Sequence, residues 1–377
     1  MSQLLVRIAK ISSSSIVKKH GLCFSELRSL STAATPYLLF DETVQDEMTL
    51  SCEPLVELNL YDPRKEETVK IPDQTLTKEL LRSRKVGSSR GWMVGKYDLS
   101  PMRWSYESTF HLTNMYNPCA SASSRKVISL PPTKEKITDI SLSASPEQED
   151  CVVAALSSGK SLIMCRPGDS DWTPIKMPFY WASGMIYSKR DGKFYLNRVS
   201  KEEYDGPVDL IDTSSGFPQV SLYKGFPLSN IPQSRLEQLS SVDKYQHIVE
   251  SPCGQSFTVY WLEESLTKEE FKALHPKEPP HQYFFKKKLK GFVVFRQDPE
   301  QRIASYTEDI GDLCIFLGDN EAFCVSATEY PGLKPNSVYF AKYDRGFGFY
   351  DLSSNTVHDV IDRPPFSCCN YWLAPLE

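Results

Sequence analysis

Long apolar runs are missing from this 377-residue chain, and so are several motifs that would indicate an activity. Its longest apolar runs, such as Cys151–Leu156 and Gly291–Phe295, are strand-sized and fall short of the roughly 18 residues that span a bilayer. There is no Cys-x-x-Cys and no His-x-x-x-His, which are common spacings of metal ligands. No Asn-x-Ser/Thr sequon occurs, so nothing supports a secretory route. We therefore expect a soluble chain without a membrane span.

The composition indicates a folded, β-rich protein. Hydrophobic residues make up 40% of the chain and charged residues 24%, which excludes a disordered chain. The 19 Phe, 19 Tyr and 6 Trp favour strands, and the 26 Pro favour many turns.

The first 30 residues differ in charge from the rest of the chain. They carry a net charge of +4, whereas the remainder carries −9. At about 100° per residue, the apolar residues between Leu4 and Ile11 would share one face of a helix, with Arg7 and Lys10 on the other side. A basic, serine-rich, amphipathic segment with almost no acid is typical of an organellar transit peptide. We interpret residues 1–30 as a transit peptide and residues 31–377 as one mature domain.

The processing site and the destination follow from the same segment. Arg28 stands at the third position before the Leu30–Ser31 bond, in a pattern that resembles plant mitochondrial processing sites. We predict cleavage between Leu30 and Ser31. The arginine and the amphipathic helix favour the mitochondrial matrix, with the plastid as the alternative. The acidic mature chain attracts phosphate poorly, so we do not expect a nucleic-acid partner.

The ten cysteines and six histidines are dispersed along the chain. Cys151, Cys165, Cys314 and Cys324 lie in apolar, strand-like runs and are interpreted as small buried hydrophobic residues in a reducing compartment. Neither residue type clusters at ligand spacing. We predict no metal site, no cofactor and no catalytic residues, and therefore a protein that is not an enzyme.

Short apolar or alternating segments recur between turn residues. They are residues 37–40, 55–61, 92–97, 109–116, 126–130, 151–156, 161–165, 193–197, 220–223, 247–250, 256–262, 282–286, 291–295, 313–317, 322–326, 337–341 and 348–352. Such a series predicts an all-β sandwich, barrel or propeller. Three short helices are expected, over residues 75–82, over residues 232–239 and after the capping box at Thr267–Glu270.

A faint repeat favours the propeller. An aromatic or aliphatic residue, then Asp or Asn, then a turn recurs at Tyr61, Tyr116, Ile211 and Tyr350. The 289 residues from Tyr61 to Tyr350 make six intervals of about 48, close to the ~40–50 residues of a propeller blade. We predict a kelch-like β-propeller of six to seven blades with a few short helices in loops. Tyr37–Phe40 and the strands around Phe347–Leu352 are expected to close the ring.

Several short sequence motifs resemble those of a plant protein family, the KIB-type β-propellers, also called domain of unknown function 295. The motifs are Gly87–Met93, Asn114–Pro118, Leu130–Pro132, Cys165–Asp169, Trp172–Thr173, Gly192–Tyr195, Ile248–Pro252, Leu313–Gly318 and Asn336–Phe340. Together they cover most of residues 37–362. The resemblance implies a kelch-like propeller and supplies no catalytic residues. With the transit peptide, it suggests an organellar branch of that family.

Many relatives in that family carry an N-terminal F-box of roughly 45 residues. Strand-like sequence starts within a few residues of the expected cleavage point here, which leaves no room for that module. A ubiquitin-ligase scaffold role is therefore not expected for this chain.

Two motifs have both a structural and a functional interpretation. Ser158–Ser161 does not complete a phosphate-binding loop, because position 154 is Ala and a strand follows, so a hairpin turn is predicted. The basic cluster Lys286, Lys287, Lys288 and Lys290 could contact RNA or an acidic partner. The preferred interpretation is a hairpin turn whose lysines protect an edge strand from aggregation.

Three functions therefore remain open at the level of sequence. The preferred hypothesis is an organelle-imported propeller that serves as a non-catalytic protein-interaction platform. The first alternative is a small-ligand binder or enzyme with a site in the propeller funnel. The second is an RNA-associated factor in organellar gene expression that uses the lysine cluster.

Overall fold

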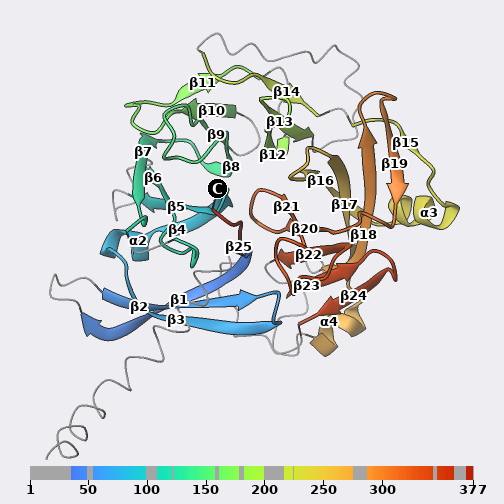
Figure 1. Cartoon of the computed structure of the whole chain (residues 1–377), viewed down its shortest axis with the longest axis horizontal. Helices are drawn as coiled ribbons and strands as arrows, with labels where there is room; N and C mark the ends of the chain where they lie inside the picture. Colours follow the sequence, from blue (N-terminus) through green and yellow to red (C-terminus); the bar gives the residue numbers. More distant parts are fainter. Residues whose placement is uncertain are drawn as a thin grey trace, which may run out of the picture.

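The computed structural model describes residues 35–48, 54–98, 108–120, 123–157, 161–177, 182–198, 216–223, 225–274, 287–342, 346–360 and 371–376. These residues form six sheets arranged around a common centre (Figure 1), which is a six-bladed β-propeller. The predicted fold class is confirmed, with the lower of the two blade counts. The predicted transit peptide and its Leu30–Ser31 cleavage site lie outside the described residues.

The first three blades follow the order of the chain. Blade 1 contains β1 (Tyr37–Met48), β2 (Pro54–Asp62), β3 (Glu67–Thr75) and the last strand, β25 (Tyr371–Leu373). Blade 2 contains β4 (Arg84–Ser89), β5 (Trp92–Asp98), β6 (Ser108–Thr113) and β7 (Val127–Thr133). Blade 3 contains β8 (Ile137–Leu142), β9 (Val153–Ser157), β10 (Ser161–Cys165) and β11 (Thr173–Ile175).

The last three blades are less regular. Blade 4 contains β12 (Ala182–Ser188), β13 (Lys193–Arg198) and β14 (Val220–Leu222), which pairs parallel to β13. Blade 5 contains β15 (Leu228–Ser229), β16 (Asp243–Glu250), β17 (Ser256–Ser265), β18 (Lys287–Asp298) and β19 (Ile303–Thr307). Blade 6 contains β20 (Leu313–Leu317), β21 (Phe323–Ser326), β22 (Ser337–Lys342), β23 (Gly346–Asp351) and β24 (Thr356–Asp359).

The three expected helices are present as α2 (Lys78–Arg82), α3 (Gln233–Ser241) and α4 (Lys268–Leu274). The capping box before α4 is formed reciprocally. The Glu270 backbone N–H donates to Thr267 Oγ1 at 3.2 Å, and the Thr267 N–H donates to Glu270 Oε2 at 2.9 Å. Within the described ranges, no helix is both long and apolar enough to cross a membrane.

Strands from the two ends of the chain close the ring, but the predicted partner was wrong. β1 pairs antiparallel with β25, through Tyr37–Leu373, Leu38–Trp372 and Leu39–Tyr371. Phe347–Leu352 belongs almost entirely to β23, which pairs inside blade 6 with β22 and β24. That region contacts β1 by side-chain packing across the blade interface, where the Phe40 and Phe347 rings lie 5.1 Å apart. A three-residue strand such as β25 is too short to show as a periodic pattern in the sequence.

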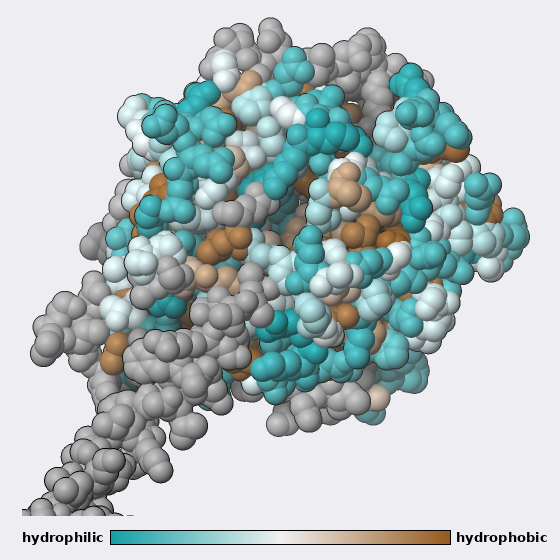
Figure 2. Space-filling view, viewed as in Figure 1, coloured by the Kyte–Doolittle hydropathy of each residue, from teal (hydrophilic) through white to brown (hydrophobic). Residues whose placement is uncertain are grey.

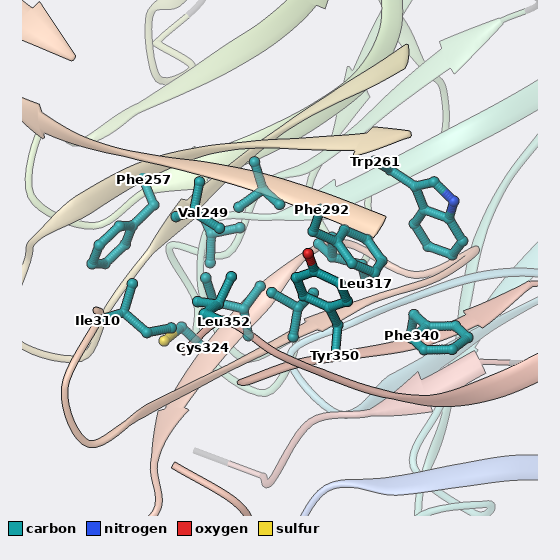
Figure 3. Packing of buried hydrophobic residues seen from close by; sticks show 14 residues of the cluster. Val249, Phe257, Trp261, Phe292, Ile310, Leu317, Cys324, Phe340, Tyr350 and Leu352 are labelled. Carbon is teal, nitrogen blue, oxygen red and sulfur yellow. The ribbon is translucent and has the colours of Figure 1, made fainter. Parts of the chain in front are cut away.

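Large apolar side chains fill the spaces between neighbouring blades. Figure 3 shows the cluster between blades 5 and 6, in which Trp261 and Phe292 of blade 5 meet Phe340 and Tyr350 of blade 6. Equivalent clusters join blades 1 and 2, blades 2 and 3, blades 3 and 4, and blades 6 and 1. Among the described residues, blades 4 and 5 are not joined by such a cluster. As far as the described residues go, that interface differs from the other five.

Candidate functional site

The lysine cluster predicted from the sequence lies at the start of β18, except Lys286, which is outside the described residues. Each described lysine faces acidic side chains. Lys287 Nζ lies 3.0 Å from Asp243, Lys288 Nζ 2.6 Å from Glu270, and Lys290 Nζ 3.3 Å from Glu264. The acids oppose the positive charge that would attract RNA, so the contacts do not favour the RNA interpretation. The described lysines lie in a strand that pairs with β17 and not in the predicted hairpin turn.

The cysteines that were expected to be small core residues are buried, as predicted. Cys151, Cys165 and Cys314 are fully covered, and Cys324 is 7% exposed. Burial raises the pKa of the Cys151 thiol to about 11 and that of Cys314 to about 12. These thiols are neutral at physiological pH and are poor nucleophiles.

The centre of the propeller forms a channel bordered by one strand from each blade: β25, β4, β8, β12, β16 and β21. Figure 2 shows this side of the molecule with a hollow near its centre. Each inner strand is the edge of its sheet. Its backbone N–H and C=O groups on the channel side therefore need partners other than a neighbouring strand.

Two carboxylates supply those partners for β12. Asp139 Oδ2 accepts the Met185 N–H at 2.7 Å, and Glu321 Oε1 accepts the Tyr187 N–H at 3.1 Å. Glu321 also accepts hydrogen bonds from the Ser89 and Ser141 hydroxyls. The two acids, from blade 3 and blade 6, therefore tie three inner strands together.

Both carboxyl groups are held where ionisation is unfavourable. Burial, with a smaller repulsion from Glu321, raises the pKa of Asp139 to about 7. Burial likewise raises the pKa of Glu321, although Arg90 and the serine hydroxyls partly oppose that effect. A carboxyl that titrates near neutrality in a channel is a candidate functional group, although its backbone hydrogen bonds also give it a structural role.

A cavity of about 380 Å³ lies on one side of Glu321. We call it the chamber and define it by seven of its lining residues: Asp139, Asn197, His247, Trp261, Asp319, Glu321 and Lys342. On the other side of Glu321 is a second hollow of about 500 Å³ lined by Arg90, Lys189 and Arg190 among others. Glu321 thus stands between two compartments of the channel.

The wall of the chamber nearest blade 5 carries one cation and one neutral imidazole. Lys342 Nζ lies 2.9 Å from the fully buried Glu263 and 4.3 Å from the Tyr245 ring centroid. Burial, with a smaller repulsion from Lys342, lowers the pKa of His247 to about 4, so its ring is neutral at physiological pH.

Some polar groups of the chamber lack protein partners among the described residues. The Asn197 side chain is 7% exposed, and its Oδ1 accepts no hydrogen bond. Trp261 Nε1 is also buried without an acceptor, and in Figure 3 this nitrogen lies on the side of the indole away from the cluster. Unsatisfied buried polar atoms are uncommon in folded proteins and are often explained by water or a ligand.

A third cavity, of about 480 Å³, lies between blades 4 and 5, where no apolar cluster of described residues fills the interface. We call it the inter-blade cleft. Its walls include Tyr195, Leu222, Tyr223, Phe226 and Ile248.

The polar groups of the inter-blade cleft are mostly engaged with one another. Ser188 Oγ donates to Glu250 Oε2 at 2.6 Å, and Gln297 Nε2 donates to Thr258 Oγ1 at 2.8 Å. Arg302, at the rim, is exposed and makes no ion pair with any described residue.

Sequence reasoning found none of these cavities. Asp139 and Glu321 are 182 positions apart in the chain, and each reads as an ordinary surface acid beside a turn. The signal in the sequence was the unusual polarity of the segments that became β8 and β12. Within the described residues, no three His, Cys, Asp or Glu side chains are placed so that they could hold a metal ion together.

The family model of the KIB1-4 β-propeller matches residues 58–353. No curated protein matches the chain. Among solved structures, a crystal structure described as a candidate 6-phosphogluconolactonase from Bacteroides fragilis is similar at 9% identity and a TM-score of 0.18. The alignment covers 74% of this chain and 54% of that one, so this chain spans about half the length of that protein. Similarity at that level carries no argument about activity.

The family match runs from within β2 in blade 1 to just after β23 in blade 6. It therefore includes the inner strands of blades 2 to 6, and it spans well over half of the chain. This chain belongs to the KIB1-4 β-propeller family.

Proposed function

We propose that this protein is a non-catalytic protein-interaction platform, and that its partner docks at the inter-blade cleft. One observation carries the proposal. In the part of the chain that the structure describes, five of the six blade interfaces are filled by apolar clusters, whereas the interface between blades 4 and 5 holds a cavity of about 480 Å³ with aromatic and aliphatic walls. An apolar concavity with a few placed polar groups is the usual form of a binding site.

The rim of the cleft favours a particular kind of partner segment. Arg302 presents a guanidinium without an ion pair to a described residue, whereas Arg190 is already bound to Asp191 at 3.0 Å. A protein segment with one large apolar side chain next to an acidic residue would fill the cleft and neutralise Arg302. Partly desolvated arginine and aromatic residues commonly dominate the energy of protein interfaces.

The state of the buried thiols and of two hydroxyls in the cleft supports a role of the cleft without catalysis. The buried thiols are neutral, and the hydroxyls of Ser188 and Tyr223 in the cleft are hydrogen-bonded to Glu250 and Thr258. Among the described residues, neither hydroxyl adjoins an imidazole that could take its proton in the way catalytic serines require.

Delivery to mitochondria remains part of the proposal. It rests on the amphipathic, basic segment 1–30 with the expected cleavage between Leu30 and Ser31, and the plastid stays the alternative destination.

Quantitative affinity purification from isolated mitochondria would test the platform. The full chain should be compared with the variants Phe226→Ala and Arg302→Glu, and with the control Lys176→Glu, which makes the same charge change at an exposed residue outside the cleft. We expect specific partners to be depleted at least several-fold from both cleft variants and retained by the control. Partners equally abundant in all four samples would refute the docking site, and partners lost after RNase treatment would favour the RNA-associated alternative.

A further inference from the structure

The chamber holds more negative than positive groups. Asp139, Asp319 and Glu321 contribute three carboxyls, and among the described lining residues the ammonium of Lys342 is the one cationic group. That ammonium is already bound to Glu263, and the nearby imidazole of His247 is neutral. A cation in the chamber would favour ionisation of these carboxyls, whereas an anion would oppose it.

Asp319 is the carboxyl most available to a ligand. Its side chain faces the open channel and makes no hydrogen bond or ion pair with a described residue. Surrounding protein raises its pKa by displacing water, and Lys342 opposes that shift without forming a contact. Binding of a cation would relieve the cost of keeping this charge in the channel.

Asn197 provides an independent observation. Its side chain is more than nine-tenths buried, its Nδ2 donates to the Gln246 carbonyl at 3.4 Å, and its Oδ1 has no partner among the described residues. A Cβ placed on Gly184 would lie 3.5 Å from Asn197 Nδ2 and 3.6 Å from Asp139 Oδ2. Gly184 therefore lies beside both side chains, which places Asn197 and Asp139 close together on the wall of the chamber.

We propose that the chamber binds a small organic cation with primary ammonium groups, held by Asp319, Asp139 and Asn197 Oδ1. An ammonium has three N–H donors and satisfies several separate acceptors at once. The acceptors come from blades 3, 4 and 6 and surround a volume of about 380 Å³, which is within the range of small-molecule sites. The chamber adjoins the inter-blade cleft, with which it shares Ile186 and Ile248, but its three proposed acceptors do not line the cleft, and the proposal does not depend on the platform role.

Titration calorimetry with putrescine on the full chain at low ionic strength would test the site. We expect saturable, one-to-one binding that 1,4-butanediol, of the same length without charge, does not reproduce. Asp319→Asn should weaken binding at least tenfold, because it removes the charge and breaks no contact with a described residue. Glu149→Gln, which removes an exposed charge outside the chamber, should leave the affinity unchanged.

Intrinsic fluorescence gives a second readout. Trp261 lines the chamber, so putrescine should change the emission of the full chain, and Trp261→Phe should remove that change. The proposal is overturned if putrescine produces neither heat nor a fluorescence change at millimolar concentration, or if butanediol binds equally well. It is also overturned if Asp319→Asn binds as tightly as the wild type, or if Mg²⁺ or Ca²⁺ binds and the diamine does not.

Discussion

Trp372→Ala tests how the ring is closed. The Trp372 side chain is fully buried, and its ring lies 5.0 Å from Phe316 and 6.1 Å from Tyr339. Its backbone is held by both neighbouring blades, because its carbonyl accepts Ser88 Oγ at 2.8 Å and its N–H donates to Asn320 Oδ1 at 3.2 Å. The residue thus anchors β25 between blades 6 and 2 as well as inside blade 1.

The magnitude follows from burial. Removing a fully buried tryptophan costs about 3–5 kcal/mol in transfer and cavity terms. The backbone contacts of β25 survive in the alanine variant, so we expect a loss of about 4 kcal/mol in the free energy of unfolding. For a domain of this size, that loss lowers the melting temperature by roughly 5 °C.

Equilibrium urea unfolding, followed by tryptophan emission and circular dichroism, is the assay. Trp172→Ala is the matched control, because Trp172 is only partly buried at the outer part of blade 3 and its Nε1 donates to the Pro131 carbonyl. We expect that variant to lose at most about half as much stability. If Trp372→Ala costs less than about 1 kcal/mol, or no more than Trp172→Ala, the ring does not depend on β25 and the argument for closure fails.

Three further changes address other parts of the molecule. Deleting residues 31–45 removes most of β1 and leaves β25 without its strand partner. The truncated chain should therefore lose its cooperative thermal transition. An unchanged midpoint of thermal unfolding would show that the segment is dispensable. Gly95→Ala places a Cβ against the imidazole of His111, closer than van der Waals contact allows. We expect the free energy of unfolding to fall by about 1–3 kcal/mol, and the double variant with His111→Ala should largely regain it. Lack of rescue would contradict the steric cause. The pKa of Asp139 is raised from 3.8 to about 7, so its contribution to stability is greatest below about pH 4 and is lost as the pH rises through about 7. The unfolding free energy of the wild type should therefore fall relative to that of Asp139→Asn between about pH 4 and 7, and parallel profiles would refute the shift.

Import is tested separately with a fluorescent fusion. Charge reversal by Arg7→Glu together with Lys10→Glu should leave the fusion in the cytosol, because import depends on the basic face of the helix. The native protein should begin at Ser31 or a few residues later. Organellar fluorescence of the double variant, or a native N-terminus at Met1, would contradict the transit-peptide interpretation.

Strands that are covered on both faces could be predicted from the amino-acid sequence. Cys151–Leu156 and Leu313–Leu317 read as strands because neighbouring blades bury both faces, which makes the runs continuously apolar. The helix after Thr267 was equally readable, because a capping box acts within four residues. Local chemistry of this kind is visible without tertiary context, and the repeat spacing then identified a propeller.

Three of the innermost strands could not be recognised in the same way, whereas parts of β16 and β21 were among the predicted segments. Arg84–Ser89, Ile137–Leu142 and Ala182–Ser188 are rich in glycine, serine and charged residues and escaped every pattern for strands. Near the axis each strand borders a channel, so its pairing depends on a neighbouring strand on one side and on side chains such as Asp139 on the other. Hydrophobic periodicity is weak where one edge faces a polar channel.

The positions of the candidate sites depend on how the six blades pack around the axis. The chamber brings Asp139, Asn197 and Asp319 together from blades 3, 4 and 6, and the inter-blade cleft exists because the described residues of blades 4 and 5 do not fill their interface as the other blades do. Closure by Tyr371–Leu373 likewise follows from the ring geometry and not from its three residues. Each of these features depends on contacts between residues far apart in the chain, and such contacts arise only when all six blades surround one axis.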